Sequence, residues 1–178
     1  PPGPAVIHPD EKHLRNLRQL TFGGQNAEGY WSADGKQIVY QRMNEAEGVM
    51  CDQQYVVDVA SGKSRMVSSG KGRVTCGHFY DGDRRVLYAS THLADPACPP
   101  PVDHSKGYAW PMTAGYDIVS HALDGSGFER LTDTPGYDAE ATLSPDGKTI
   151  VFTSVRDGDL EIYTMATDGT GVKRLTHE

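Results

Sequence analysis

A ten-residue phrase occurs three times along this chain and limits the folds open to it more than any other feature. It is clearest at residues 143–152, which read Leu-Ser-Pro-Asp-Gly-Lys-Thr-Ile-Val-Phe. Residues 31–40 repeat it closely, and residues 79–88 repeat it with a turn sequence that has diverged. A fixed internal period indicates an array of one small structural unit.

Each unit ends on a second phrase, which sets its length. Arg-Leu-Thr closes two units at Thr132 and Thr176, and related triplets end at Thr21 and Ser68. The intervals between these positions are 47, 64 and 44 residues. The outer two match a four-stranded blade of a β-propeller, and the middle one is long enough to hold an insertion. The sequence therefore predicts an all-β propeller segment with three blades.

The repeated phrase also predicts how each blade is built and covered. Asp-Gly favours a tight hairpin turn. The strands after it are continuously apolar, as in residues 150–152, which predicts a strand covered on both faces by neighbouring blades. In blade one we expect the third strand near residues 55–58. The predicted boundaries are an N-terminal extension 1–13, an outer closing strand 14–20, blade one 21–68, blade two 69–132 and blade three 133–176.

Three blades are too few for a ring, because closed propellers have about four to eight. Residues 14–20 have the pattern of an outer strand with no blade before it, and such a strand often closes a ring by joining the last blade. We expect either a longer chain or a second copy to complete the ring.

The repeats resemble the TolB-type β-propeller repeats of bacterial periplasmic proteins, which also occur in propeller domains of some peptidases and lyases. The resemblance covers about Leu14 to Thr176 and is closest from Tyr137 onward. It implies a binding scaffold in a six-bladed ring. It is specific for fold and weak for function.

Charge and hydropathy exclude some partner classes. The formal net charge of −7 leaves no basic footprint for nucleic acid or for an anionic membrane surface. No apolar run approaches the length of a membrane span. We expect a protein partner.

The three cysteines are predicted to lie on one face of the propeller. Cys51 and Cys98 fall in the expected loops between second and third strands, and Cys76 falls in the connection between blades. One disulfide with a spare thiol is favoured over a metal site, because no CxxC spacing is present. Cys98 is the expected member, with Cys51 and Cys76 as rival partners. A disulfide would favour a periplasmic or extracellular location.

The insertion in blade two, residues 91–115, is the main departure from the repeat. Long loops on rigid scaffolds often carry function. An equally open alternative is a lid whose aromatic side chains pack inward. The candidate contact residues of this loop are His92, Cys98, His104, Tyr108 and Trp110.

A second candidate site lies where the inner strands begin. Asn26 and Glu28 in blade one match Asp138 and Glu140 in blade three, and all four are expected at the mouth of the central channel. Converging carboxylates could hold calcium, with Glu28, Asp138 and Glu140 as ligands. The competing interpretation is that they hydrogen-bond within and between blades, as repeated residues usually do.

Catalysis has little support in the sequence. No Gly-x-Ser-x-Gly or His-Glu-x-x-His motif is present. The sequence favours a non-catalytic scaffold for protein–protein interaction in the cell envelope or outside the cell, without a cofactor unless calcium binds. The alternative is the propeller domain of a hydrolase or lyase with catalytic residues outside this segment or a metal at the channel mouth. Within this segment, the candidate residues for such chemistry are His78, His92 and His104.

Overall fold

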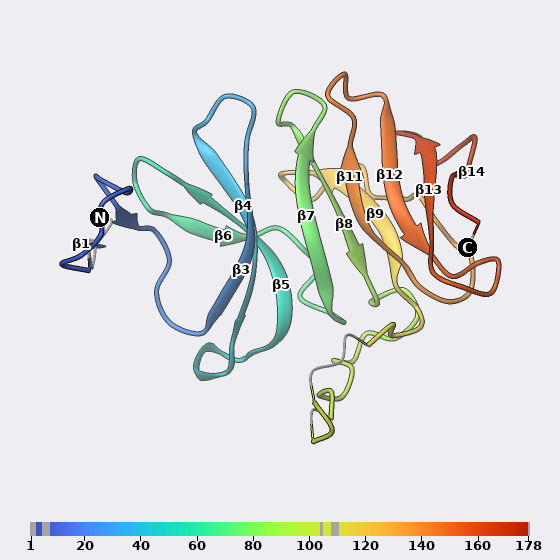
Figure 1. Ribbon diagram of the computed structural model, residues 1–178, viewed down its shortest axis with the longest axis horizontal. Helices are drawn as coiled ribbons and strands as arrows, with labels where there is room; N and C mark the ends of the chain where they lie inside the picture. Colours follow the sequence, from blue (N-terminus) through green and yellow to red (C-terminus); the bar gives the residue numbers. More distant parts are fainter. Residues whose placement is uncertain (1–2, 5–7, 104, 108–110, 178) are drawn as a thin grey trace.

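The computed structural model contains three four-stranded antiparallel sheets that lie side by side (Figure 1). The structure describes residues 3–4, 8–103, 105–107 and 111–177. Blade one comprises β3 (Gln25–Trp31), β4 (Gln37–Asn44), β5 (Val49–Asp58) and β6 (Ser64–Met66). Blade two comprises β7 (Val74–Tyr80), β8 (Arg85–Ser90), β9 (Asp117–Ala122) and β10 (Glu129–Arg130). Blade three comprises β11 (Asp138–Leu143), β12 (Thr149–Ser154), β13 (Glu161–Ala166) and β14 (Lys173–Arg174). The predicted all-β propeller segment with three blades is confirmed.

The repeated phrase makes its hairpin through a serine and an aspartate. In blade three the Ser144 hydroxyl donates to Asp146 Oδ1 at 2.6 Å and accepts the Thr149 N–H at 3.0 Å. Gly147 then takes the left-handed backbone conformation, at φ 68°. In the decayed copy the carboxylate of Asp83 instead accepts the N–H of Ala33 at 2.8 Å. The turn of blade two is thereby bonded to the turn of blade one.

The closing phrase fixes the outer strand of each blade to the third strand. In blade two the Thr132 hydroxyl accepts the N–H of Ile118 at 2.9 Å, and Arg130 donates to Asp117 at 2.8 Å. The same hydroxyl bond occurs at 2.9 Å in the other blades, from Ile162 to Thr176 and from Gln54 to Ser68. The phrase is therefore structural.

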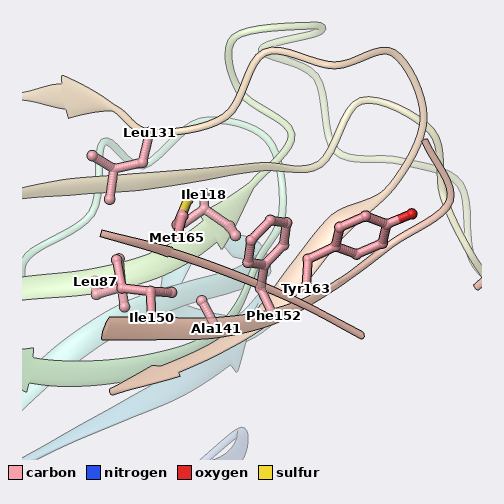
Figure 2. Packing of buried hydrophobic residues seen from close by; sticks show 8 residues of the cluster. All are labelled: Leu87, Ile118, Leu131, Ala141, Ile150, Phe152, Tyr163 and Met165. Carbon is pink, nitrogen blue, oxygen red and sulfur yellow. The ribbon is translucent and has the colours of Figure 1, made fainter. Parts of the chain in front are cut away.

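Each blade has a forward face, which packs on the next blade, and a back face, which packs on the previous one. Leu87, Ile118 and Leu131 on the forward face of blade two meet the back face of blade three (Figure 2). That back face contributes Ala141, Ile150, Phe152, Tyr163 and Met165. Between blades one and two, the cluster comprises Val39, Val56, Val67, Val74, Val86, Tyr88 and Val119.

The junction between blades one and two also contains a polar side chain. Gln54 holds the forward-face position that Ile118 and Ile162 hold in the other blades, and it is fully buried. Its amide lies against Gly77, where a Cβ atom would come within 2.3 Å of Gln54 Oε1. Only glycine fits at residue 77 without a shift of Gln54.

The third strand of blade one is longer than predicted. Strand β5 begins at Val49, not near residue 55, because its ladder with β4 continues to the pair Asn44–Val49. A single 3-10 turn, Glu45–Glu47, makes the connection. The prediction of Cys51 in a loop is therefore wrong, since Cys51 lies within β5.

The N-terminal segment forms a small sheet of its own. Strand β1 (Gly3–Pro4) pairs with β2 (Arg18–Gln19), and the Arg18 side chain donates to the carbonyl of Val59 in blade one at 3.2 Å. The role of residues 14–20 as the outer strand of a last blade stays a prediction.

Candidate interaction face

A disulfide ties the inserted loop of blade two to the body of blade one. It joins Cys51 in β5 to Cys98 in the loop, with Cα atoms 5.7 Å apart. The expected disulfide is therefore present, and Cys51 is the partner of Cys98. Cys76 is a free thiol, and it lies within β7, so its predicted place in the connection between blades is wrong. The loop projects from the edge of the blades where β4 connects to β5 (Figure 1).

The first half of the loop is also held by hydrogen bonds. The Thr91 carbonyl accepts the N–H groups of Ala94 and Asp95, both at 3.0 Å. Pro96 accepts the N–H of Gly72 at 2.8 Å, and Arg73 donates to the carbonyl of Pro99 at 3.3 Å. The loop is therefore bonded to the connection that enters blade two.

His92, one of the candidate contact residues, packs against the protein. Its Nδ1 atom is 2.7 Å from the Ser90 hydroxyl, and its ring stands edge-on to Phe128 with centroids 5.7 Å apart. Burial lowers the pKa of His92. This arrangement fits the lid alternative at this position. His104, Tyr108 and Trp110 lie outside the described residues.

Exposed apolar side chains occur next to the disulfide and on the tethered loop. Met50, which precedes Cys51, is 58% exposed, and Leu93 and Met112 on the loop are 42% and 52% exposed. A groove of about 330 Å³ runs beside the disulfide. Its lining residues are Gly48, Val49, Met50, Cys51, Gln53, Met66, Gly70, Gly72, Pro96 and Cys98. We call the exposed methionines, the groove and the tethered loop the tether face.

The channel-mouth candidates occupy one recurring position in the inner strands. Glu28, Cys76 and Glu140 have φ values of 50°, 50° and 56°, in the left-handed region. At each of them the pairing register of the inner strand shifts, as it does at a β-bulge. The sequence alignment of Glu28 with Glu140 thus reflects a shared backbone irregularity.

The carboxylates at these bulges are bonded within their own blades. Tyr30 donates to Glu28 at 2.5 Å, a bond that raises the Tyr30 pKa to about 12. Thr153 donates to Glu140 at 3.0 Å, and Tyr137 also donates to it, at 3.2 Å. These contacts agree with the structural interpretation of the repeated residues.

The structure does not bring Glu28, Asp138 and Glu140 together as ligands of one ion. Asp138 is only 1% exposed, and Arg156 donates to both of its oxygens at 3.1 Å. In the part of the chain that the structure describes, no three His, Cys, Asp or Glu side chains are placed to hold a metal. Asn26 is exposed, and its amide donates to the Gly23 carbonyl at 3.1 Å.

Two residues that contact the bulge positions, Tyr30 and Gln41, were not predicted from the sequence. The Tyr30 ring lies against the His78 ring at an interplanar angle of 41°, with centroids 4.1 Å apart, and Gln41 Oε1 accepts the Cys76 N–H at 3.4 Å. Burial lowers the pKa of His78 and raises that of the Cys76 thiol. Tyr30 follows Glu28 by two residues whereas Tyr137 precedes Glu140 by three, so no common spacing could have revealed the tyrosines.

The comparisons with known proteins agree with this architecture. No family model matches the chain. The Tol-Pal system protein TolB of Bordetella pertussis is 48% identical over 52 residues, which are 29% of this chain and 12% of that protein. The solved structure of a putative TolB from Agrobacterium tumefaciens superposes with a TM-score of 0.69 at 22% identity, over 88% of this chain and 51% of the other. TolB from Acinetobacter baumannii gives 0.67 at 23% identity, over 92% and 35%. The chain is a TolB-like β-propeller protein.

The TolB-like chain spans only part of the proteins it resembles, from 12% to 51% of their lengths in these three matches. Enzymes share the fold as well. A puromycin-hydrolyzing peptidase of Mycobacterium tuberculosis is 15% identical, with a TM-score of 0.58 over 89% of this chain and 23% of that one. At such identity the likeness shows the fold alone. Among the described residues of the TolB-like chain, no helix has the length and apolarity to cross a membrane.

Proposed function

We propose that this chain is a non-catalytic interaction segment of the bacterial cell envelope, which presents its tether face to a protein of a Tol–Pal-type system. The observation that carries the proposal is the Cys51–Cys98 bond, which fixes an inserted loop onto a rigid three-blade body. Fixing a loop before binding reduces the ordering entropy lost in the complex. The match to a TolB protein supports the choice of system.

The periplasm is the location we propose. Disulfides persist in oxidising compartments such as the periplasm and are rare in the cytosol. The Cys51–Cys98 bond closes a span of 47 residues, so its loss would release the loop. A chain that depends on this bond fits an oxidising compartment.

The tether face has the composition of a contact surface. Met50, Leu93 and Met112 are exposed, and methionine is flexible enough to fill irregular gaps against a partner. Apolar anchors surrounded by polar atoms are typical of the centre of protein interfaces. We therefore assign Met50 and Met112 as the anchors.

The test is binding of the purified chain to each purified component of a Tol–Pal system by biolayer interferometry. The double variant Met50→Asp and Met112→Asp should weaken binding at least about tenfold, which corresponds to about 1.4 kcal/mol. Val172→Asp is the matched control, because Val172 is 42% exposed and lies beside the turn between β13 and β14, away from the tether face.

Reduction of the disulfide gives a second readout. The variant with both Cys51→Ser and Cys98→Ser should bind more weakly, since its loop is no longer fixed, while Cys76→Ser should bind as the parent does. The proposal would be refuted if none of the components showed saturable binding to the chain. Equal binding by the parent and the double aspartate variant would also refute it.

A further inference from the structure

The connection between blades one and two has the composition of a hinge. Residues 67–73 join the outer strand β6 of blade one to the inner strand β7 of blade two. They include Gly70 and Gly72, whose φ values of 74° and 61° lie in the left-handed region. The connection between blades two and three, residues 131–137, carries Pro135. Because proline restricts the backbone and glycine frees it, the first connection has the greater conformational freedom.

This connection is nevertheless held by two neighbours. Gln53 of β5 accepts the Gly70 N–H at 3.0 Å and donates to the Gly72 carbonyl at 2.9 Å. The Gly72 N–H donates in turn to the carbonyl of Pro96 in the inserted loop, at 2.8 Å. The connection is thus bonded to blade one through β5 and to blade two through the loop.

The loop also packs closely on the connection. A Cβ atom at Gly72 would come within 2.7 Å of both the His92 nitrogen and Thr91 Oγ1, at the base of the loop. The Arg73 N–H donates to the same Thr91 hydroxyl at 2.9 Å. Since these contacts leave no free space around Gly72, the loop has to move before the connection can change its conformation.

The disulfide completes a closed circuit around the connection. Cys98 of the loop is bonded to Cys51, which lies on the same strand as Gln53. The strand β5 is therefore bonded to the connection, the connection to the loop, and the loop to β5. The one covalent bond in this circuit, apart from the chain itself, is the disulfide, so its state determines how firmly the circuit is held.

We propose that the Cys51–Cys98 bond is a redox-sensitive lock on a hinge at residues 69–73. With the bond intact the connection is held, and reduction by a dithiol frees the loop and lets blades one and two move apart. Cys98 is exposed and lines the groove, whereas Cys51 is only 5% exposed, so a dithiol reaches the bond at Cys98. The inference does not depend on the partner proposed above.

The reduction is a thiol–disulfide exchange in two steps. A thiolate of the dithiol attacks the Cys98 sulfur to form a mixed disulfide, and the Cys51 sulfur leaves as a thiolate that takes up a proton. The second thiolate of the dithiol then attacks the sulfur of the first, and the Cys98 thiolate leaves and is protonated. The dithiol is oxidised to a disulfide and both cysteines are reduced. The two-cysteine site of a thiol oxidoreductase supplies a dithiol of this class.

Cys76 reports on the opening of the junction. Its N–H donates to Gln41 of blade one at 3.4 Å, and its thiol is free and half-buried. Burial raises the pKa of the Cys76 thiol, and alkylation requires the thiolate. Movement of blade one away from blade two should therefore speed the alkylation of Cys76.

Native reduction followed by labelling tests the lock on the full chain. Dithiothreitol without denaturant should reduce the Cys51–Cys98 bond while the chain stays folded. Once the reagent is removed, alkylation of Cys76 by iodoacetamide and hydrogen exchange of the Gly72 amide should each be at least about tenfold faster than in the oxidised chain. Peptide mass spectrometry separates Cys76 from the other two cysteines. The double variant Cys51→Ala and Cys98→Ala should behave as the reduced chain does, without any reductant.

The strand amides of β12 and β13 in blade three are the internal control, and their exchange should not change. The proposal is overturned if dithiothreitol reduces the bond only in denaturing urea, or if reduction leaves the alkylation of Cys76 unchanged. It is also overturned if the amides of blade three accelerate as much as the Gly72 amide, because the bond would then stabilise the whole fold rather than one hinge. None of these readouts involves a partner, so a failure of the binding experiment above does not affect them.

Discussion

Glu28, Cys76 and Glu140 are the residues at which each inner strand departs from regular β geometry. All three have positive φ without being glycine. An L-residue in this region costs about 1–2 kcal/mol, because its Cβ crowds the following carbonyl oxygen. The cost recurs in every blade, which indicates that the bulge is a fixed part of the repeat.

Substitutions at Cys76 test this backbone constraint. Relative to Cys76→Ala, we expect Cys76→Gly to be at least as stable and Cys76→Val to lose about 1–2 kcal/mol of unfolding free energy, since a β-branched side chain fits φ of 50° poorly. Urea denaturation of the three variants measures the differences. A valine variant as stable as the alanine variant would mean that the strand has no fixed bulge here.

At the scale of elements, the turns and closing phrases were predictable and the strand lengths were not. Ser144-Pro145-Asp146-Gly147 carries its own hydrogen-bond partners, so local chemistry identifies it. Strand β5 starts with Val49-Met50-Cys51-Asp52, which has no strand pattern, and only its pairing with β4 defines it. The bulges, and the tyrosines that donate to the carboxylates there, depend on the pairing register between neighbouring strands. The spacing of residues along one sequence does not reveal that register. The sequence predicted one disulfide that includes Cys98, but it left the partner open between Cys51 and Cys76.

The closing phrase gives a prediction for the outer strands. Thr132 is 6% exposed and its hydroxyl accepts the Ile118 N–H, so Thr132→Val leaves a buried donor without its partner. We expect a loss of about 1–3 kcal/mol of unfolding free energy, while Thr132→Ser keeps the acceptor and most of the stability. A larger loss in Thr132→Ser than in Thr132→Val, measured by urea denaturation, would contradict this and show that packing of the threonine methyl dominates.

At the scale of the whole molecule, two sets of groups give stability the same dependence on pH. Hydrogen bonds from serine or threonine hydroxyls and backbone N–H groups lower the pKa of the turn aspartates Asp34, Asp58, Asp124, Asp146 and Asp168. Burial lowers the pKa of His78, His92 and His121. In both sets the unfolded chain takes up protons at a higher pH than the folded chain does. The stability of the fold therefore decreases as the pH is lowered.

The histidine contribution should disappear first as the pH falls below about 6.5, and the aspartate contribution below about 4. We expect the Tm to drop between about pH 7 and pH 5, and to drop further toward pH 3. His121→Gln should reduce the first drop, because His121 is only 4% exposed and bonded to Tyr88 and Ala122. Calorimetry checks this, with the exposed His13→Gln as control. A Tm that is flat from pH 7 to pH 5 contradicts the prediction.

The glutamine between blades one and two has a consequence for the order in which the molecule comes apart. Gln54 is fully buried, and neither polar atom of its side-chain amide finds a partner among the described residues. The corresponding position between blades two and three is Ile118, which joins an apolar cluster. Both junctions expose hydrocarbon when they open, but opening the one between blades one and two also rehydrates an unpaired amide, which lowers the cost of that opening. We therefore expect this junction to open first, with blade one still held to blade two by the Cys51–Cys98 disulfide, and hydrogen exchange should report the strand amides of blade one opening before those of blade three.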